Sequence, residues 1–208
     1  MIHSILVGMI GQLQPSGGGP GTITIGNTAS TSIPASLNKT PWSYEYDYSF
    51  AAMIVLQSEL GSSKTIESIE FRVDNISSNF TANNQKIIMG HITETSFLGN
   101  TPDVDLTDYT VSNKTTVLNT FSKSYTTADN DTWIKFDLTT ANFNYNGTDS
   151  LVIIWENKDG SYTFTGPNTY FDTSFGTNLT AYKRQDSSYP SGICSLTNER
   201  PIMKINYI

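Results

Sequence analysis

Short extended runs bounded by Gly, Asn, Asp and Pro recur along this chain from residue 22 to residue 208. About ten such runs follow one another, as in a sandwich of antiparallel strands. Residues 151–155 (LVIIW) are apolar throughout, which is typical of a central strand covered on both faces. Residues 106–111 and 116–121 form weaker runs, and residues 56–61 form a strand end or one helical turn closed by glycine. The pattern predicts an all-β fold: a single jelly-roll-type antiparallel β-sandwich.

A second regularity runs through residues 42–50, where five aromatic side chains alternate with polar ones. Strict period-2 spacing predicts that all five lie on one face of an extended strand. Such a face is either part of the core, where each buried ring contributes about 1.5–3 kcal/mol, or an exposed platform that stacks against sugars. A chain with few charges and one cysteine needs a large core, so we expect burial. The five residues are Trp42, Tyr44, Tyr46, Tyr48 and Phe50.

Composition excludes two classes of protein. Only 15% of the 208 residues are charged and 12% are aromatic, whereas a disordered chain is rich in charge and poor in aromatic rings. Lys and Arg number 12 against 19 Asp and Glu, for a net charge of −7. A nucleic-acid-binding protein needs an excess of basic residues to neutralise phosphates. We therefore expect a folded protein with no nucleic-acid partner.

The chain offers little for catalysis. Cys194 is the only cysteine, and activating it would require a neighbouring cation such as His3 or His91, so we expect a small, semi-buried thiol instead. One cysteine and two histidines are too few for an all-protein structural zinc site. No nucleophile elbow, phosphate loop or H-E-x-x-H motif occurs. We expect no enzyme; the alternative is a hydrolase that uses two carboxylates among Glu45, Asp47, Glu94 and Glu156.

Residues 1–13 form an apolar segment followed by a Gly- and Pro-rich hinge at residues 15–21. The segment has neither the basic residue nor the cleavage site of a secretory signal, and it is too short to span a bilayer. We interpret residues 1–21 as an arm that docks on a neighbouring subunit, ahead of a sandwich domain at residues 22–208. The alternative is a first strand of the same domain. The expected docking residues are Ile2, Ile5, Leu6, Val7, Met9, Ile10 and Leu13.

Two further groups are candidates for ligand contacts. Four aromatic residues lie in a loop-rich region between glycines, where we expect exposed contact residues: Tyr162, Phe164, Tyr170 and Phe171. Two acidic loops carry carboxylates that suit Ca²⁺, although neither has the EF-hand pattern: Asp103, Asp105 and Asp108, and Asp129 and Asp131. The alternative for these acidic residues is that they cap turns through their own side chains. We expect no cofactor, with calcium as the open possibility.

Three stretches resemble segments of a known module. Residues 88–97 (IMGHITETSF) are similar to a YMGHTTxTSF motif, residues 145–153 (YNGTDSLVI) to YNGTDNLVI, and residues 200–205 (RPIMKI) to RPxIxF. These motifs, in this order, belong to a β-sandwich module of secreted and surface proteins of Bacteroidota. The resemblance covers residues 22–207 and implies a non-catalytic adhesion or assembly unit.

Departures from that module shape the expected function. Its secreted members carry a signal peptide and often a sorting domain, whereas this chain shows the apolar arm. We therefore predict a structural protein of a large assembly, made in the host cytoplasm: a phage virion component such as a capsid decoration, fibre or tail-associated subunit. Its partners would be other protein subunits in an oligomer, and surface glycans during adsorption, without membrane insertion. The alternative is an extracellular or cell-surface carbohydrate-binding or adhesion module.

Overall fold

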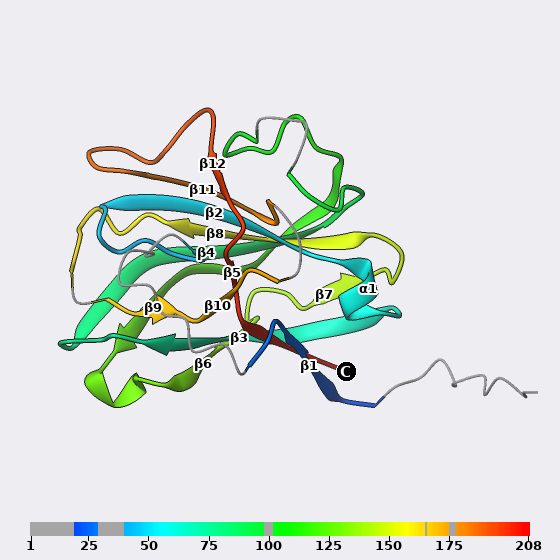
Figure 1. The fold of residues 1–208 in the computed structure, drawn as a ribbon, viewed down its shortest axis with the longest axis horizontal. Helices are drawn as coiled ribbons and strands as arrows, with labels where there is room; N and C mark the ends of the chain where they lie inside the picture. The colour runs from blue at the N-terminus through cyan, green and yellow to red at the C-terminus, as the bar shows by residue number, and fades with distance from the viewer. Residues whose placement is uncertain (1–18, 29–39, 98–101, 165, 175–177) are drawn as a thin grey trace, which may run out of the picture.

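Two antiparallel sheets pack face to face in this computed structural model, which describes residues 19–28, 40–97, 102–164, 166–174 and 178–208 (Figure 1). The expected all-β sandwich is confirmed, while its jelly-roll connectivity stays a prediction. The seven docking residues expected in the arm lie outside the described residues: Ile2, Ile5, Leu6, Val7, Met9, Ile10 and Leu13.

Sheet A forms the lower layer in Figure 1. Its strand order is β1 (Gly21–Ile25), β14 (Met203–Tyr207), β3 (Lys64–Asp74) and β6 (Thr132–Asp137). Two short strands also pair with β3, namely β7 (Phe143–Tyr145) and β9 (Asn168–Thr169). The first strand of the described chain is therefore hydrogen-bonded to the last one, although about 180 residues separate them in sequence.

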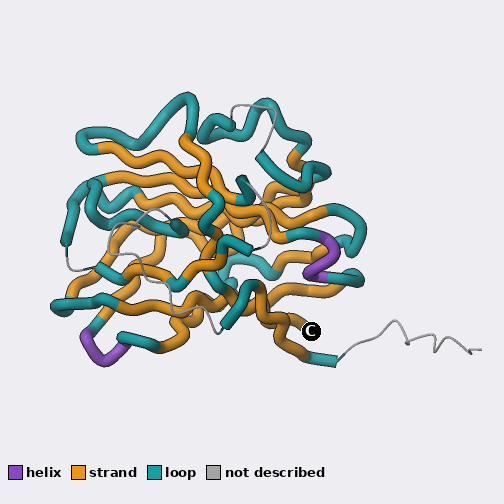
Figure 2. The backbone as a smooth tube through the Cα atoms, viewed as in Figure 1, coloured by secondary structure: helices purple, strands orange, loops and turns teal. Residues whose placement is uncertain are grey.

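Sheet B forms the upper layer (Figure 2), and it contains the two longest strands of the described chain. Its order is β12 (Ser195–Thr197), β11 (Thr180–Gln185), β2 (Tyr48–Val55), β8 (Ser150–Asn157), β4 (Phe80–Ile92) and β5 (Val111–Tyr125). A separate two-stranded pair joins β10 (Phe171–Asp172) to β13 (Arg200–Pro201). The helical elements are α1 (Gln57–Leu60) and the 3-10 turn η1 (Thr127–Asp129). Of the two alternatives for residues 56–61, the structure has the helical turn, and Gly61 ends it at φ 74°.

An aromatic cluster fills the space between the two sheets. The ring of Trp42 lies 4.8 Å from that of Trp155 on β8, and Trp155 lies 5.0 Å from Phe136 on β6. Both indole N–H groups have partners, because Trp42 donates to the Pro167 carbonyl at 3.0 Å and Trp155 donates to Gln85 at 2.8 Å. Because the rings pack edge to face and both indole N–H groups are hydrogen-bonded, the position of each ring in this core is fixed.

The outer face of sheet B is also covered. Ile54 and Ile154 point away from sheet A into a second cluster, which loop residues Phe97, Leu106 and Cys194 complete. Strand β8 is therefore buried on both faces, as its uninterrupted apolar sequence predicts. The outward face of sheet A instead carries polar side chains that bond across strands, as where the Asn206 amide donates to Ser68 and to Glu70.

The five alternating aromatic residues do not share one face, so that prediction is wrong. Residues 41–47 are not part of a strand, and β2 begins only at Tyr48. Trp42 and Tyr44 lie in the cluster between the sheets, whereas Phe50 lies in the second cluster. The expected burial holds for these three rings, which are at most 4% exposed.

The weak run at residues 106–111 is also not a strand. The Asp103 carboxylate accepts hydrogen bonds from the backbone N–H of Asp105 and of Thr107, at 3.2 and 2.9 Å. Leu106 adopts φ 57° within this turn. The local hydrogen bonds hold a turn here, and β5 begins only at Val111.

Candidate functional site

Two expected contact residues, Tyr162 and Phe164, stand exposed on the loop that follows β8. Their side chains are 60% and 74% exposed, and their ring centroids lie 5.4 Å apart in an edge-to-face arrangement. Between them, the Thr163 backbone N–H donates to the Tyr44 carbonyl at 2.7 Å. This hydrogen bond fixes the loop to the rest of the domain at Thr163, between the two exposed rings. We call Tyr162 and Phe164 the aromatic rim.

A cavity of about 200 Å³ opens beside the aromatic rim. The ring of Phe80 lies 5.3 Å from Tyr44 and stacks on Tyr125 at 5.1 Å, so this part of the wall is continuous with the core. We call the cavity the rim pocket. It is lined by Tyr44, Phe80, Thr81, Asp159, Ser161, Tyr162 and Thr163.

Asp159 is held in the rim pocket by hydrogen bonds on both carboxylate oxygens. Oδ2 accepts from the Asn83 backbone N–H at 2.7 Å, and Oδ1 accepts from the Ser161 hydroxyl at 3.1 Å. The Asp159 backbone N–H donates to Asn157 Oδ1 at 3.1 Å. Asn157 also accepts from buried Gln85 at 2.5 Å, which links the pocket to the core. The carboxylate is therefore oriented before any ligand arrives.

The other two expected contact residues do not join this site. Tyr170 is only 6% exposed, so its expected exposure is wrong. Its ring is covered by the Arg72 guanidinium at 4.2 Å, and its hydroxyl donates to Asp131 at 3.0 Å. Phe171 is half-buried on β10. A cation over the ring and a carboxylate on the hydroxyl explain why this tyrosine is covered rather than exposed.

In the two acidic loops, the observed hydrogen bonds favour turn capping over calcium binding. Besides its backbone bonds, Asp103 accepts from the Thr107 hydroxyl at 2.7 Å, and these contacts lower the pKa of Asp103. Asp129 accepts from the Thr126 N–H at 2.7 Å, and Asp131 pairs with Arg72. Asp105 and Asp108, the remaining candidates, are exposed. Among the described residues, no three His, Cys, Asp or Glu side chains form a group that could hold a metal ion.

Cys194 and His91 lie on opposite sides of sheet B. Cys194 packs in the outer cluster, where burial raises the pKa of its thiol to about 12. His91 packs between the sheets, with its ring 5.0 Å from that of Phe143, and burial lowers its pKa. Its Nε2 accepts from the Asn146 N–H at 3.0 Å. The thiol is therefore a core group, as we expected, and His91, the histidine in the described part of the chain, is not placed to activate it.

One carboxylate considered for hydrolysis, Glu156, is committed to ion pairs. Lys158 and Lys86 approach it at 2.7 and 3.2 Å. Burial acts to raise the pKa of Glu156, but the two ammonium groups outweigh it and lower the pKa. A general acid needs a raised pKa, so this group does not fit that role.

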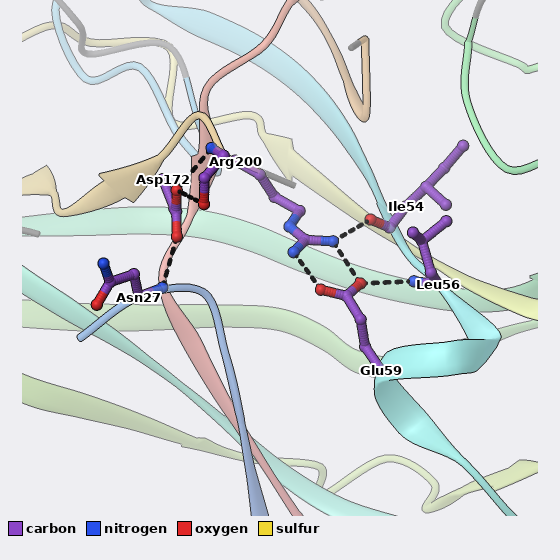
Figure 3. Close-up of polar contacts among 7 residues, drawn as sticks. Asn27, Ile54, Leu56, Glu59, Asp172 and Arg200 are labelled. Carbon is purple, nitrogen blue, oxygen red and sulfur yellow. Dashed lines mark hydrogen bonds and ion pairs between the residues drawn. The ribbon is translucent and has the colours of Figure 1, made fainter. Parts of the chain in front are cut away.

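Sequence analysis missed a buried ion pair between Glu59 of α1 and Arg200 of β13 (Figure 3). Arg200, whose side chain is 2% exposed, donates to the two Glu59 oxygens at 2.5 and 2.7 Å, and also to the Ile54 carbonyl at 3.0 Å. Glu59 further accepts from the Leu56 N–H at 2.9 Å. Both carboxylate oxygens are thus used within the fold. We interpret this cluster, the Arg200 clasp, as structural rather than ligand-binding.

Comparisons with protein-family models, curated proteins and solved structures find no match to this chain. The resemblance to a Bacteroidota module therefore stays a prediction. In the described part of the chain, no helix is long and apolar enough to cross a membrane.

Proposed function

We propose that this protein is a non-enzymatic structural component of a phage particle, and that its body contacts a glycan on the host surface. One observation carries the second part. Of all the described aromatic side chains, only those of Tyr162 and Phe164 are exposed; Tyr162 lines the rim pocket, and the ring of Phe164 lies 5.4 Å from that of Tyr162. A fold that buries or half-buries all its other described rings has no packing reason to expose these two.

The chemistry of the rim pocket supports a saccharide ligand. Sugars present apolar C–H faces that pack against aromatic rings and hydroxyl groups that need hydrogen-bond partners. The aromatic rim supplies the rings, while Asp159 and Ser161 supply polar atoms beside them. Pockets that combine apolar walls with a few oriented polar groups are typical of small-ligand sites.

The particle part of the proposal is supported by the chain order. The described strands, from Gly21 of β1 to Tyr207 of β14, build both sheets of the sandwich. The apolar arm precedes β1 in sequence and would bind a neighbouring subunit through its seven large apolar side chains.

A glycan array tests the contact function. We expect the full chain to bind at least one glycan, and Tyr162→Ala and Phe164→Ala to lose that binding. Ile193→Ala is the matched control, because Ile193 is 65% exposed and does not line the rim pocket. Absence of binding to every glycan would remove the contact function.

Deletion of residues 1–14 tests the docking function. We expect the shortened body to melt like the full chain but to be missing from purified particles. Unfolding of the shortened body would instead make the segment part of the core. Recovery of the full chain from culture medium, free of particles, would favour the secreted adhesion module.

A further inference from the structure

We infer that the rim pocket binds a single uncharged sugar ring and discriminates against acidic sugars. The inference rests on the proposed contact function, since it names the class of saccharide that the same site takes. It follows from the charge, the hydrogen-bonding capacity and the size of the pocket.

The charge of the pocket is negative. Asp159 is the only charged side chain among the lining residues. The Tyr44 hydroxyl stays neutral, because burial raises its pKa well above the usual value. The neighbouring cation, Lys158, is engaged elsewhere: it pairs with Glu156 at 2.7 Å and lies 4.4 Å from the centre of the Tyr189 ring. A carboxylate on the sugar would therefore face Asp159 without a cation to compensate it.

The hydrogen-bonding capacity of Asp159 matches hydroxyl groups. An ionised carboxylate has about four acceptor positions. The Asn83 N–H and the Ser161 hydroxyl use one on each oxygen. We infer that the two remaining acceptor positions bind two hydroxyl groups on adjacent carbons of the sugar ring. Because the protein already orients the carboxylate, binding does not need to order it.

The size of the pocket sets the number of sugar units. Its volume of about 200 Å³ is below the roughly 300–1,000 Å³ of pockets that enclose drug-sized ligands. A single ring fits such a space, with one face against Tyr162. The next unit of a chain would lie outside the pocket, near the exposed ring of Phe164. The site thus suits a terminal sugar or a side branch.

Titrations followed by NMR test this inference. The probes are the methyl glycosides of glucose, galactose and mannose, and those of glucuronic and galacturonic acid, at pH 7. We expect the best neutral glycoside to bind at least about tenfold more tightly than its uronic acid counterpart. Tyr162→Ala should weaken neutral binding by about tenfold or more.

Asp159→Asn is the decisive variant, since it removes the charge and keeps the shape. We expect it to reduce the preference for neutral over acidic sugars to within about threefold. Asp137→Asn is the matched control, because it removes one negative charge at an exposed position of β6, and the preference should be unchanged. Thermal melting of both variants checks that they fold.

The outcomes separate the two proposals. If uronic acid glycosides bind the unaltered protein as tightly as neutral ones, the inference is overturned while the contact function stands. If Asp159→Asn leaves the preference intact, Asp159 is not its source and the inference also fails. If none of the probes and no glycan on the array binds, both proposals fall together.

Discussion

Breaking the Arg200 clasp on one side should destabilise the fold strongly. Arg200→Met removes the cation but leaves the Glu59 carboxylate, whose side chain is only 13% exposed, without its partner. Removing one member of a buried ion pair costs about 3–5 kcal/mol, because the remaining charge stays desolvated. For a domain of 150–250 residues, each kcal/mol lowers the melting temperature by about 2–4 °C. We therefore expect a drop of about 6–20 °C.

A double-mutant cycle separates the ion pair from simple loss of packing. Arg200→Met, Glu59→Leu and the double variant are unfolded in urea, with fluorescence from buried Trp42 and Trp155 as the readout. We expect the two single costs together to exceed the cost of the double variant by about 2–3 kcal/mol. Lys135→Met, which removes an exposed pair with Asp137, is the control and should leave the midpoint unchanged. A cost for Arg200→Met below about 1 kcal/mol, the value of an exposed pair, would refute the reasoning.

Two further predictions concern single residues. Burial lowers the pKa of His91, so the unfolded chain binds a proton more tightly, at a pKa of about 6.5. The free energy of unfolding should therefore decrease as pH falls from 6.5 towards the lower pKa of the folded state. Urea titrations at several pH values should show a weaker pH dependence for His91→Gln. An equal dependence of the free energy of unfolding on pH in both proteins would contradict this prediction. Gly147→Ala should destabilise by about 1–3 kcal/mol, because φ is 78° and the added Cβ meets the Ser63 backbone. Gly192→Ala is the control: φ is 71° there too, but the added Cβ would meet only Lys183 Nζ, at an ordinary contact distance of 3.9 Å, so it should lower the melting temperature less. Equal losses in the two variants would exclude the clash at Gly147.

The sequence predicts those parts of the fold in which burial alone determines the pattern. Strand β8 is buried on both faces, and residues 151–155 within it form an unbroken apolar run, so the sequence correctly predicts a central strand there. The alternation from Trp42 to Phe50 misleads because residues 41–47 are not part of a strand, so period-2 spacing does not place their side chains on one face. Trp42 and Tyr44 reach the cluster between the sheets from this loop, whereas Phe50, on β2, lies in the second cluster.

The candidate site was predicted in part. Glycines on either side of Tyr162 and Phe164 indicated a loop, and exposure follows from that. Tyr170 was misplaced because its covering cation, Arg72, lies almost a hundred residues earlier in the chain. The Arg200 clasp joins residues 141 positions apart, so no local pattern reveals the pair. Glu59 gives no local signal either, because Leu56 at the N-cap has no side-chain oxygen and the capping-box pattern requires one.

The pairing of β1 with β14 has a consequence for how the protein is made. Sheet A cannot close while the ribosome still holds residues 203–207, because β14 lies between β1 and β3. Until then the apolar side chains of β3, such as Ile69 and Phe71, lack the neighbour that shields one edge of their strand. Nascent chains therefore remain partly assembled until β14, the last of the described strands, has been synthesised, and a chaperone that protects β3 during translation would raise the yield of folded protein.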